Sequence, residues 1–185
     1  MSSTKINTSQ IVVNEQITLE PFQPEDKAAL ILYLNDPVLY ANTLKVPNPY
    51  TAIHAEEWLL RVEAEKDAPG GIANWSIRHR EAGLIGGIGA FMKTGLDGHL
   101  DEIGYWLAEP FRGQGIMTEV VRRYTEWLFD TRPALRRIEA GVFAHNPASA
   151  RVLEKAGFVR EGYARQLHEK NGVFIDAILL AKLRY

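Results

Sequence analysis

The sequence has no cysteine, and this absence excludes several classes of site at once. Disulfides, thiolate metal sites and catalysis by a cysteine nucleophile all require the missing side chain. Long apolar runs are also lacking, because the longest, from Ala28 to Leu34, is far too short to cross a bilayer. The formal net charge is only −2, so the composition indicates neither a nucleic-acid nor a membrane partner. The five histidines are scattered without ligand-like spacing, and we therefore expect no metal site.

The first ten residues, MSSTKINTSQ, lack the apolar core of a secretory signal, and we expect a cytoplasmic protein. The chain has 185 residues, of which 46% are apolar and 24% are charged. These values are typical of one soluble domain with a substantial core. We expect residues 1–15 to form a flexible tail and residues 16–185 to form that domain.

Hydrophobic periodicity and turn residues predict the order of the secondary structure. Strands are expected at Ile17–Phe22, Asn74–Arg80, Leu84–Met92, Leu100–Leu107, Arg137–Phe143, Val159–Leu167 and Val173–Leu183. Helices are expected from Pro24 to about Asn35, from Thr51 to about Lys66, from Ile116 to Asp130 and from Asn146-Pro147 to Gly157. Loops or breaks are expected at Asn35-Asp36-Pro37, Val46–Tyr50 and Asp67–Gly71. This order predicts a single α/β (α+β) domain, with a mixed central sheet of about seven strands flanked by about four helices.

A glycine turn connects a predicted strand to a predicted helix in the stretch YWLAEPFRGQGIMTE, Tyr105 to Glu119. A helix N-terminus leaves amides unpaired and carries the positive end of the helix dipole, so it favours an anion such as phosphate. Arg112 can add a two-pronged contact, and the glycines permit close approach of the backbone. The stretch is neither a Walker A loop nor a G-x-G-x-x-G motif. The alternative interpretation is a turn that only links the strand to the helix.

A second cluster lies about thirty residues downstream, where Asn146-x-x-Ser149 begins a helix that ends in Gly157-Phe158. Together with YWLAEPFRGQG, this cluster resembles the GNAT superfamily of N-acetyltransferases, and most closely the branch that acetylates the N-termini of ribosomal proteins. That family has Arg/Gln-x-x-Gly-x-Gly/Ala in its cofactor loop, and Arg112 and Gly115 match the first two anchors. The strand segment Ile103–Leu107 and the tail motifs also resemble this branch. The resemblance covers roughly residues 16–185, and it implies the GNAT fold.

Acetyl-CoA is the cofactor that the resemblance implies, with its diphosphate on the N–H groups of residues 113–118 and its pantetheine arm along the preceding strand. The residues implied in cofactor binding are Tyr105, Trp106, Leu107, Arg112, Gly113, Gln114, Gly115, Ile116, Met117, Thr118, Asn146, Ser149 and Lys155. Met117 stands where the family has a small residue, and its side chain is large enough to narrow the approach.

Acetyl transfer from a thioester to an amine requires a neutral amine, a donor for the carbonyl oxygen and a donor for the departing thiolate. The resemblance and the absence of cysteine favour direct attack in a ternary complex. We expect a backbone N–H of the Tyr105–Leu107 strand to stabilise the oxyanion. Leu153 stands where many GNAT enzymes carry a proton-donating tyrosine, and by resemblance Ser149 takes that role. The alternative is that Ser149 only bonds backbone in the first helical turn.

Two residues are candidates for the general base. His168 lies where the resemblance places a glutamate base, and its ordinary pKa of about 6.5 suits the role. Glu102 is the rival, because it precedes the cofactor strand. The alternative for either residue is an exposed surface group without a role in the reaction.

The acceptor site is expected between residues 39–58 and 165–174, with a monomer or a homodimer acting on acetyl-CoA and an amine. The residues expected to bind the acceptor are Tyr40, Tyr50, His54, Glu102 and His168. A peptide N-terminus and a small amine both fit. The absence of the usual tyrosine also leaves open an acyl-CoA-binding module without turnover, and a third reading is an unrelated nucleotide-binding domain.

Overall fold

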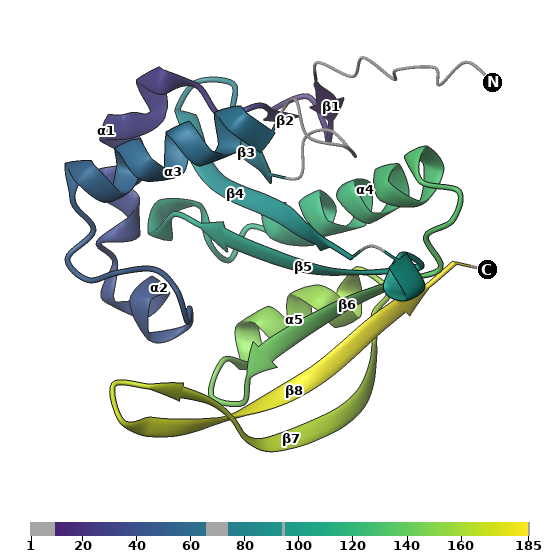
Figure 1. Ribbon diagram of the computed structural model, residues 1–185. Coiled ribbons are helices and arrows are strands. Elements are labelled where there is room, and N and C mark those ends of the chain that lie inside the picture. The colour runs from purple at the N-terminus through teal and green to yellow at the C-terminus, as the bar shows by residue number, and fades with distance from the viewer. Residues whose placement is uncertain (1–9, 66–73, 94, 185) are drawn as a thin grey trace.

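Residues 10–65, 74–93 and 95–184 are described by a computed structural model of the chain (Figure 1). They form one eight-stranded mixed sheet with the order β1-β2-β3-β4-β5-β6-β8-β7. The strands are β1 (Ile11–Val12), β2 (Ile17–Glu20), β3 (Asn74–His79), β4 (Gly83–Met92), β5 (Leu100–Leu107), β6 (Arg137–Phe143), β7 (Val159–Lys170) and β8 (Val173–Leu183). Neighbouring strands are antiparallel, except that β5 and β6 are parallel.

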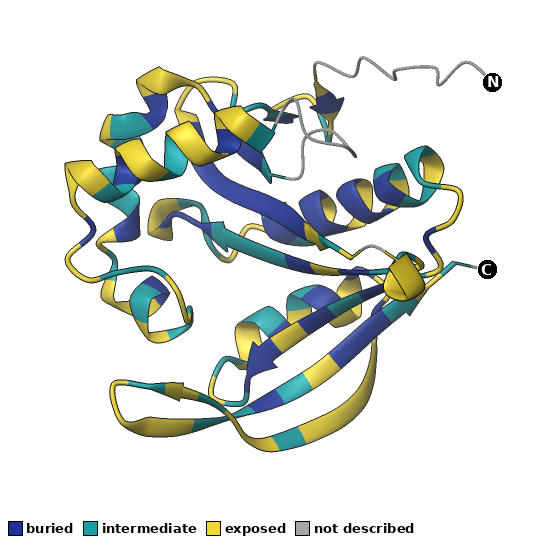
Figure 2. Cartoon of the chain, in the orientation of Figure 1, coloured by how far each residue is buried: buried dark blue, intermediate teal, exposed yellow. Residues whose placement is uncertain are grey.

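Helices cover both faces of this sheet. They are η1 (Pro24–Asp26), α1 (Lys27–Leu34), α2 (Pro37–Ala41), α3 (Ala52–Glu65), η2 (Gly95–Asp97), η3 (Glu109–Phe111), α4 (Ile116–Thr131) and α5 (Pro147–Lys155). Leu84 packs in a core cluster with α1, α2 and α3, whereas its neighbour Ile85 packs in the larger cluster with α4 and α5. Because successive strand residues point to opposite faces, the two helix groups lie on opposite sides of the sheet. Figure 2 shows that β4, which packs against both groups, is buried along most of its length. None of the helices in these ranges has both the length and the apolar composition that crossing a membrane requires.

The predicted fold class is confirmed, with two additions that the sequence pattern did not indicate. Strand β1 lies within the segment predicted as a flexible tail, and Ile11 is buried because β1 pairs with β2. A two-residue strand is too short to show an alternating pattern. The predicted break at Asp67–Gly71 and residues 1–9 of the tail lie outside the described residues.

Helix α2 is the second addition. The segment Asn35-Asp36-Pro37 was expected only to end the preceding helix. Asp36 is instead the N-cap of α2, because its carboxylate accepts a hydrogen bond from Val38 N–H at 2.7 Å. Pro37 follows at the first helical position, which its fixed φ suits. The same residues therefore end one helix and begin the next.

Strands β5 and β6 pair along only a short part of their length. Their register covers Leu100–Arg137, Asp101–Ile138 and Glu102–Glu139, and no later pairs follow. Beyond Glu102 the two strands diverge, and Figure 1 shows the widening separation toward their C-terminal ends. The central sheet therefore contains a wedge-shaped interruption, which we call the divergence.

Candidate active site

The turn between β5 and α4 leaves a row of main-chain amides unpaired. Gly115 is the N-cap of α4 with φ 81°, and Gly113 has φ 76°, so both adopt the left-handed conformation that favours glycine. Among the residues that the structure describes, no acceptor bonds the amides of residues 113–117. The amide of Thr118, which was expected to belong to this row, already donates to Gly115 O at 3.0 Å. Together with the α4 dipole, the five free amides form a cradle for an anion.

Arg112 has protein partners on both sides of this cradle. Its Nε donates to Leu107 O at 2.9 Å, and its terminal nitrogen forms an ion pair with Asp36 at the start of α2. The guanidinium thus holds the loop against α2, and the phosphate contact expected from the sequence stays a prediction. Burial raises the pKa of Asp36, but the hydrogen bonds from Arg112 and from Val38 N–H outweigh it and leave the pKa below its ordinary value.

The other side chains of the predicted cofactor loop are also placed by the structure. Met117 is buried in the larger core, so its side chain does not narrow the cradle. Gln114 Nε2 donates to Pro110 O at 3.0 Å, within the turn itself. Lys155 is exposed at the end of α5, where its carbonyl accepts a hydrogen bond from Arg122 at 3.2 Å. Lys155 and Arg122 thus place two cations where α4 and α5 lie side by side.

The backbone of β5 presents its own unpaired groups to the divergence. Ala108 N–H donates to Ile85 O at 2.8 Å, which sets the alternation along β5. In an antiparallel pair, the backbone N–H and C=O groups of every second residue bond the partner strand. The backbone groups of Trp106 therefore point toward β4, whereas those of Tyr105 and Leu107 point away from it. The oxyanion donor predicted in this strand is therefore narrowed to the N–H of Tyr105 or of Leu107. Trp106 instead packs its side chain against the smaller core.

Ser149 is brought into direct contact with Tyr105. The two hydroxyl oxygens are 2.8 Å apart, and the Tyr105 hydroxyl also lies 3.2 Å from Ser149 O. Asn146, the N-cap of α5, accepts the Ser149 N–H at 3.2 Å, as its position before Pro147 predicted. Burial raises the pKa of Tyr105 to about 12, although the contact with Ser149 acts in the opposite direction. Leu153, at the position of the missing tyrosine, is fully buried in the core.

His168 is positioned by an irregularity in β7. The pairing of β7 with β8 shifts between Ala164 and His168, and Gln166 at the shift has φ 52°. The carboxylate of Asp176 accepts the Gln166 N–H at 2.7 Å and thereby holds the irregular segment in place. The imidazole of His168 is half-buried, with its ring centre 5.4 Å from that of Phe143 at the end of β6.

A second imidazole, that of His145, approaches the same phenylalanine. Its ring centre is 5.5 Å from that of Phe143, and its Nε2 lies 3.2 Å from Ala41 O. A carbonyl oxygen only accepts hydrogen bonds, so Nε2 carries the proton and Nδ1 has the free lone pair in the neutral ring. In the sequence, only the position of His145 beside Asn146 connects it with the site. The rival base, Glu102, is exposed at the last β5–β6 pair.

The residues expected to bind the acceptor separate into two groups. Tyr40 lies at the site, where Lys170 Nζ sits 3.4 Å above its ring centre and Asn171 donates to its hydroxyl at 2.8 Å. Lys170 also donates to the carbonyls of Tyr40 and Thr43. These contacts fasten the tip of the β7–β8 hairpin to α2. With the Arg112–Asp36 and His145–Ala41 contacts, α2 therefore bridges the open end of the divergence.

Tyr50 and His54 have structural surroundings instead. Tyr50 is buried in the smaller core, and its hydroxyl donates to His54 O at 3.3 Å. His54 accepts the Thr51 N–H through Nδ1 at 3.0 Å at the start of α3. Neither residue is brought to the divergence by these contacts.

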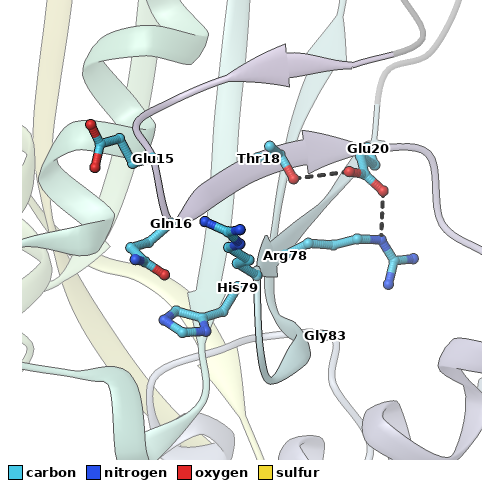
Figure 3. Close-up of a pocket in the computed structure, with 8 residues that line it drawn as sticks. Glu15, Gln16, Thr18, Glu20, Arg78, His79 and Gly83 are labelled. Atoms are coloured by element: carbon cyan, nitrogen blue, oxygen red, sulfur yellow. Dashed lines mark hydrogen bonds and ion pairs between the residues drawn. The ribbon is translucent and has the colours of Figure 1, made fainter.

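A separate surface hollow lies on β2 and β3 (Figure 3), and the ring centre of His79, which lines it, is 5.7 Å from that of Phe111 in η3. Its central charges are paired, because Arg78 contacts Glu20 at 3.1 Å and Asp26 at 2.8 Å. We therefore interpret the hollow as part of the N-terminal packing. Within the three described ranges, no three histidine, aspartate or glutamate side chains converge as metal ligands would.

The amino-acid sequence is similar to those of known acetyltransferases. The family model described as an acetyltransferase (GNAT) domain matches residues 16–159. A Bacillus subtilis protein named "Probable N-acetyltransferase YjcK" is 51% identical over 81 residues, which are 44% of each chain. The SPbeta prophage-derived N-acetyltransferase YokL, also from B. subtilis, is 30% identical over 92% of this chain and 91% of its own length.

Solved structures share the fold over nearly the whole chain. The ribosomal-protein-S5-alanine acetyltransferase from Vibrio fischeri has a TM-score of 0.82 and 25% identity, covering 95% of this chain and 97% of its own. The microcin C7 self-immunity acetyltransferase MccE, solved in complex with acetyl-CoA and AMP, has a TM-score of 0.83 and 20% identity, covering 98% and 100%. The predicted resemblance, including relatives among the ribosomal-protein acetyltransferases, is confirmed.

Proposed function

This chain belongs to the GNAT acetyltransferase family, and from that premise we propose that it transfers an acetyl group from acetyl-CoA directly to a primary amine in a ternary complex. One observation carries the proposal. The unpaired amides of residues 113–117 follow the β5 edge at the divergence, and Tyr105 of that strand contacts Ser149 of α5. The presence of acetyl-CoA in the MccE structure supports the choice of cofactor.

The cradle fits a diphosphate in charge and in conformation. Its amides have no acceptor among the described residues, and a Cβ at Gly113 or Gly115 would meet no other atom within 4 Å, so there is open space at both glycines. We assign these amides to the diphosphate and the groups of Tyr105 and Leu107 to the pantetheine arm, which would pair as an added strand does. Lys155, beside Arg122, supplies positive charge for the remaining phosphate.

Acetyl-CoA supplies an activated acyl group as a thioester. The chain therefore needs only to position the two reactants and to stabilise the charges that develop during transfer. The N–H of Tyr105 or Leu107 is the donor to the carbonyl oxygen as negative charge develops there. Ser149 is the donor to the departing sulfur. His168 accepts the proton that the attacking amine loses, since a ring nitrogen of a neutral imidazole has a free lone pair. His145, on the other side of Phe143, is the residue that would substitute for it.

The acceptor enters, in this proposal, on the side of α2 and the β7–β8 hairpin. Tyr40, Phe143 and the two histidines offer aromatic surface and hydrogen bonds to an amine-bearing group. A protein N-terminus and a small-molecule amine are the two candidate acceptors. The bridge formed by α2 restricts how large a folded acceptor can be, which favours an extended peptide end or a small molecule.

An amine panel tests the proposal directly. The wild-type protein should release free thiol from acetyl-CoA only in the presence of a suitable amine, and mass spectrometry should find the acetyl group on nitrogen. Calorimetric binding of coenzyme A without turnover, across peptide N-termini, polyamines and amino acids, would instead support an acyl-CoA-binding module. Stabilisation by ATP or NAD and not by coenzyme A would support an unrelated nucleotide-binding function.

A further inference from the structure

We propose that Tyr105 is a positioning residue whose hydroxyl holds the Ser149 hydroxyl in place, so that Ser149 directs its own proton at the sulfur of the cofactor. The inference rests on the proposed function and deepens it. It arises from a contact between two segments that the sequence places 44 positions apart, with hydroxyl oxygens at 2.8 Å.

The local structure of α5 leaves the Ser149 hydroxyl free for this task. A serine in the first turn of a helix ordinarily caps the helix or bonds the carbonyl one turn back. Here Asn146 already caps the helix, because its side-chain oxygen accepts the Ser149 N–H. The Ser149 hydroxyl therefore has one partner among the described residues, which is Tyr105.

Two hydrogen-bond arrangements are available to this pair. In the first, Ser149 donates to the Tyr105 oxygen, and Tyr105 donates to Ser149 O at 3.2 Å. In the second, Tyr105 donates to Ser149 Oγ, and the serine proton is free to point at a third group. A sulfur that gains negative charge selects the second arrangement, because the tyrosine bond then reinforces the serine donor.

Tyr105 acts through a hydrogen bond and keeps its proton. Burial raises its pKa to about 12, whereas an ordinary thiol has a pKa of about 8.5. Full transfer of the phenol proton to a thiolate is therefore unfavourable by a factor of more than about 1,000. When the C–S bond breaks, its electron pair goes to sulfur, which receives a hydrogen bond from Ser149. The amine proton goes to His168, and the thiolate takes its final proton from solvent.

Titration of bound coenzyme A tests this without requiring turnover. The ultraviolet absorbance of the thiolate reports the thiol pKa in the complex, and the wild type should lower it relative to free coenzyme A. Tyr105→Phe and Ser149→Ala should each weaken thiolate stabilisation about tenfold, which is one pKa unit, as expected for a hydrogen bond to a charged group. The double variant should show no further change, because Tyr105 acts only through Ser149.

Two further variants separate this role from a general loss of stability. Tyr124→Phe removes a fully buried hydroxyl from the same core and should leave the thiol pKa at the wild-type value. A fluorinated tyrosine at position 105 keeps the ring and strengthens the phenol as a donor, so it should lower the thiol pKa further. This substitution also provides the test if Tyr105→Phe does not fold.

The outcomes distinguish the two proposals. Coenzyme A that binds to Tyr105→Phe with a wild-type thiol pKa overturns the positioning role alone. Additive effects in the double variant also overturn it, because they indicate that Tyr105 acts independently of Ser149. Failure of the wild type to bind coenzyme A overturns the proposed function, and this inference with it.

Discussion

The two sides of the divergence are built from different parts of the polypeptide. The side proposed for the cofactor consists of main chain, namely the amides of residues 113–117 and the β5 edge at Tyr105 and Leu107. The side proposed for the acceptor consists of side chains from α2, the β6–α5 loop and the β7–β8 hairpin. A main-chain site requires backbone conformations that few residue types adopt, whereas a side-chain site requires only proximity in space. The first therefore leaves a local pattern in the sequence, and the second does not.

Removing the proposed base should produce the largest loss of acetyl-transfer rate. Because the base lies on the proposed acceptor side, coenzyme A binding should not be affected. We expect His168→Ala to lower the acetyl-transfer rate about 100- to 1,000-fold at neutral pH, because general-base catalysis is worth that much. Calorimetry should find coenzyme A affinity nearly unchanged. His99→Ala, which removes an exposed histidine beside η2, is the matched control. A wild-type rate in His168→Ala would remove this residue as the base, and His145→Ala would then be the next variant.

Changing the backbone of the cradle should act on the cofactor side only. Gly115→Val places a β-branched residue at φ 81°, which costs about 1–2 kcal/mol and misaligns the neighbouring amides. The strain itself lowers stability in the free and bound states alike, so the loss of affinity comes from the misaligned amides. Losing one hydrogen bond to a charged group should lower coenzyme A affinity about 10- to 100-fold by calorimetry. Gly162→Ala in β7, where the added Cβ meets only ordinary contacts, should leave affinity unchanged. Equal losses in both variants would mean that the cradle is not where coenzyme A binds.

Releasing the hairpin from α2 should produce a smaller effect on the acceptor side. Lys170→Met removes an ammonium that bonds two carbonyls and lies over the Tyr40 ring. We expect the KM for the amine to rise about tenfold, since hydrogen bonds to a charged group are being lost, while the KM for acetyl-CoA stays the same. Lys27→Met, which breaks an exposed ion pair with Glu56, is the control. A change in the acetyl-CoA KM alone would contradict the assignment of the two sides.

The smallest effect should come from the contact that joins the two sides. Asp36→Ala removes the cap of α2 and the ion pair with Arg112, and we expect it to lower the free energy of unfolding by about 1 kcal/mol. Asp36→Asn keeps a good capping group and removes only the charge, so it should cost less.

The pH dependence of that contribution follows from the lowered pKa of Asp36. Because the folded-state pKa is below the unfolded-state value of about 3.9, the stabilisation is fully present above that value. It is lost as the pH falls through the lower folded-state pKa. Denaturant unfolding at several acidic pH values should therefore show a weaker acid dependence in Asp36→Asn than in the wild type. Identical acid dependence would mean that the ion pair contributes nothing to stability.

The parts of the fold that the sequence predicted are those with local signals. The turn into α4 was predicted from Gly113 and Gly115, and the start of α5 from Asn146-Pro147, because each conformation restricts the residue type. Strands β5, β6 and β8 have the predicted bounds because alternation or apolar runs span their whole length. Helix α2 was missed because five residues are too few for a helical period, and because it depends on Arg112, 76 positions away.

The candidate site was predicted as a set of residues and not as a set of contacts. Tyr105 and Ser149 were both named, but nothing in their spacing indicates that their hydroxyls meet. The role of Arg112 was predicted from its charge and from its match to the family's cofactor loop, whereas the carboxylate that pairs with it belongs to a helix with no sequence pattern of its own. Tyr50 and His54 were named because they lie near the expected acceptor segment in sequence, and packing instead places Tyr50 in the smaller core.

The short β5–β6 pairing has a consequence for solubility. Beyond Glu102, each strand presents an unpaired edge in the middle of the sheet, and such an edge is a template for association with another polypeptide. Arg112 donates to one carbonyl of the β5 edge, and α2 lies across the open end of the divergence. The groups that surround the proposed ligand site therefore also cover these unpaired strand edges. A bound coenzyme would act as a substitute strand there. The proposed binding mode therefore predicts that resistance to aggregation and affinity for the coenzyme are linked in this chain.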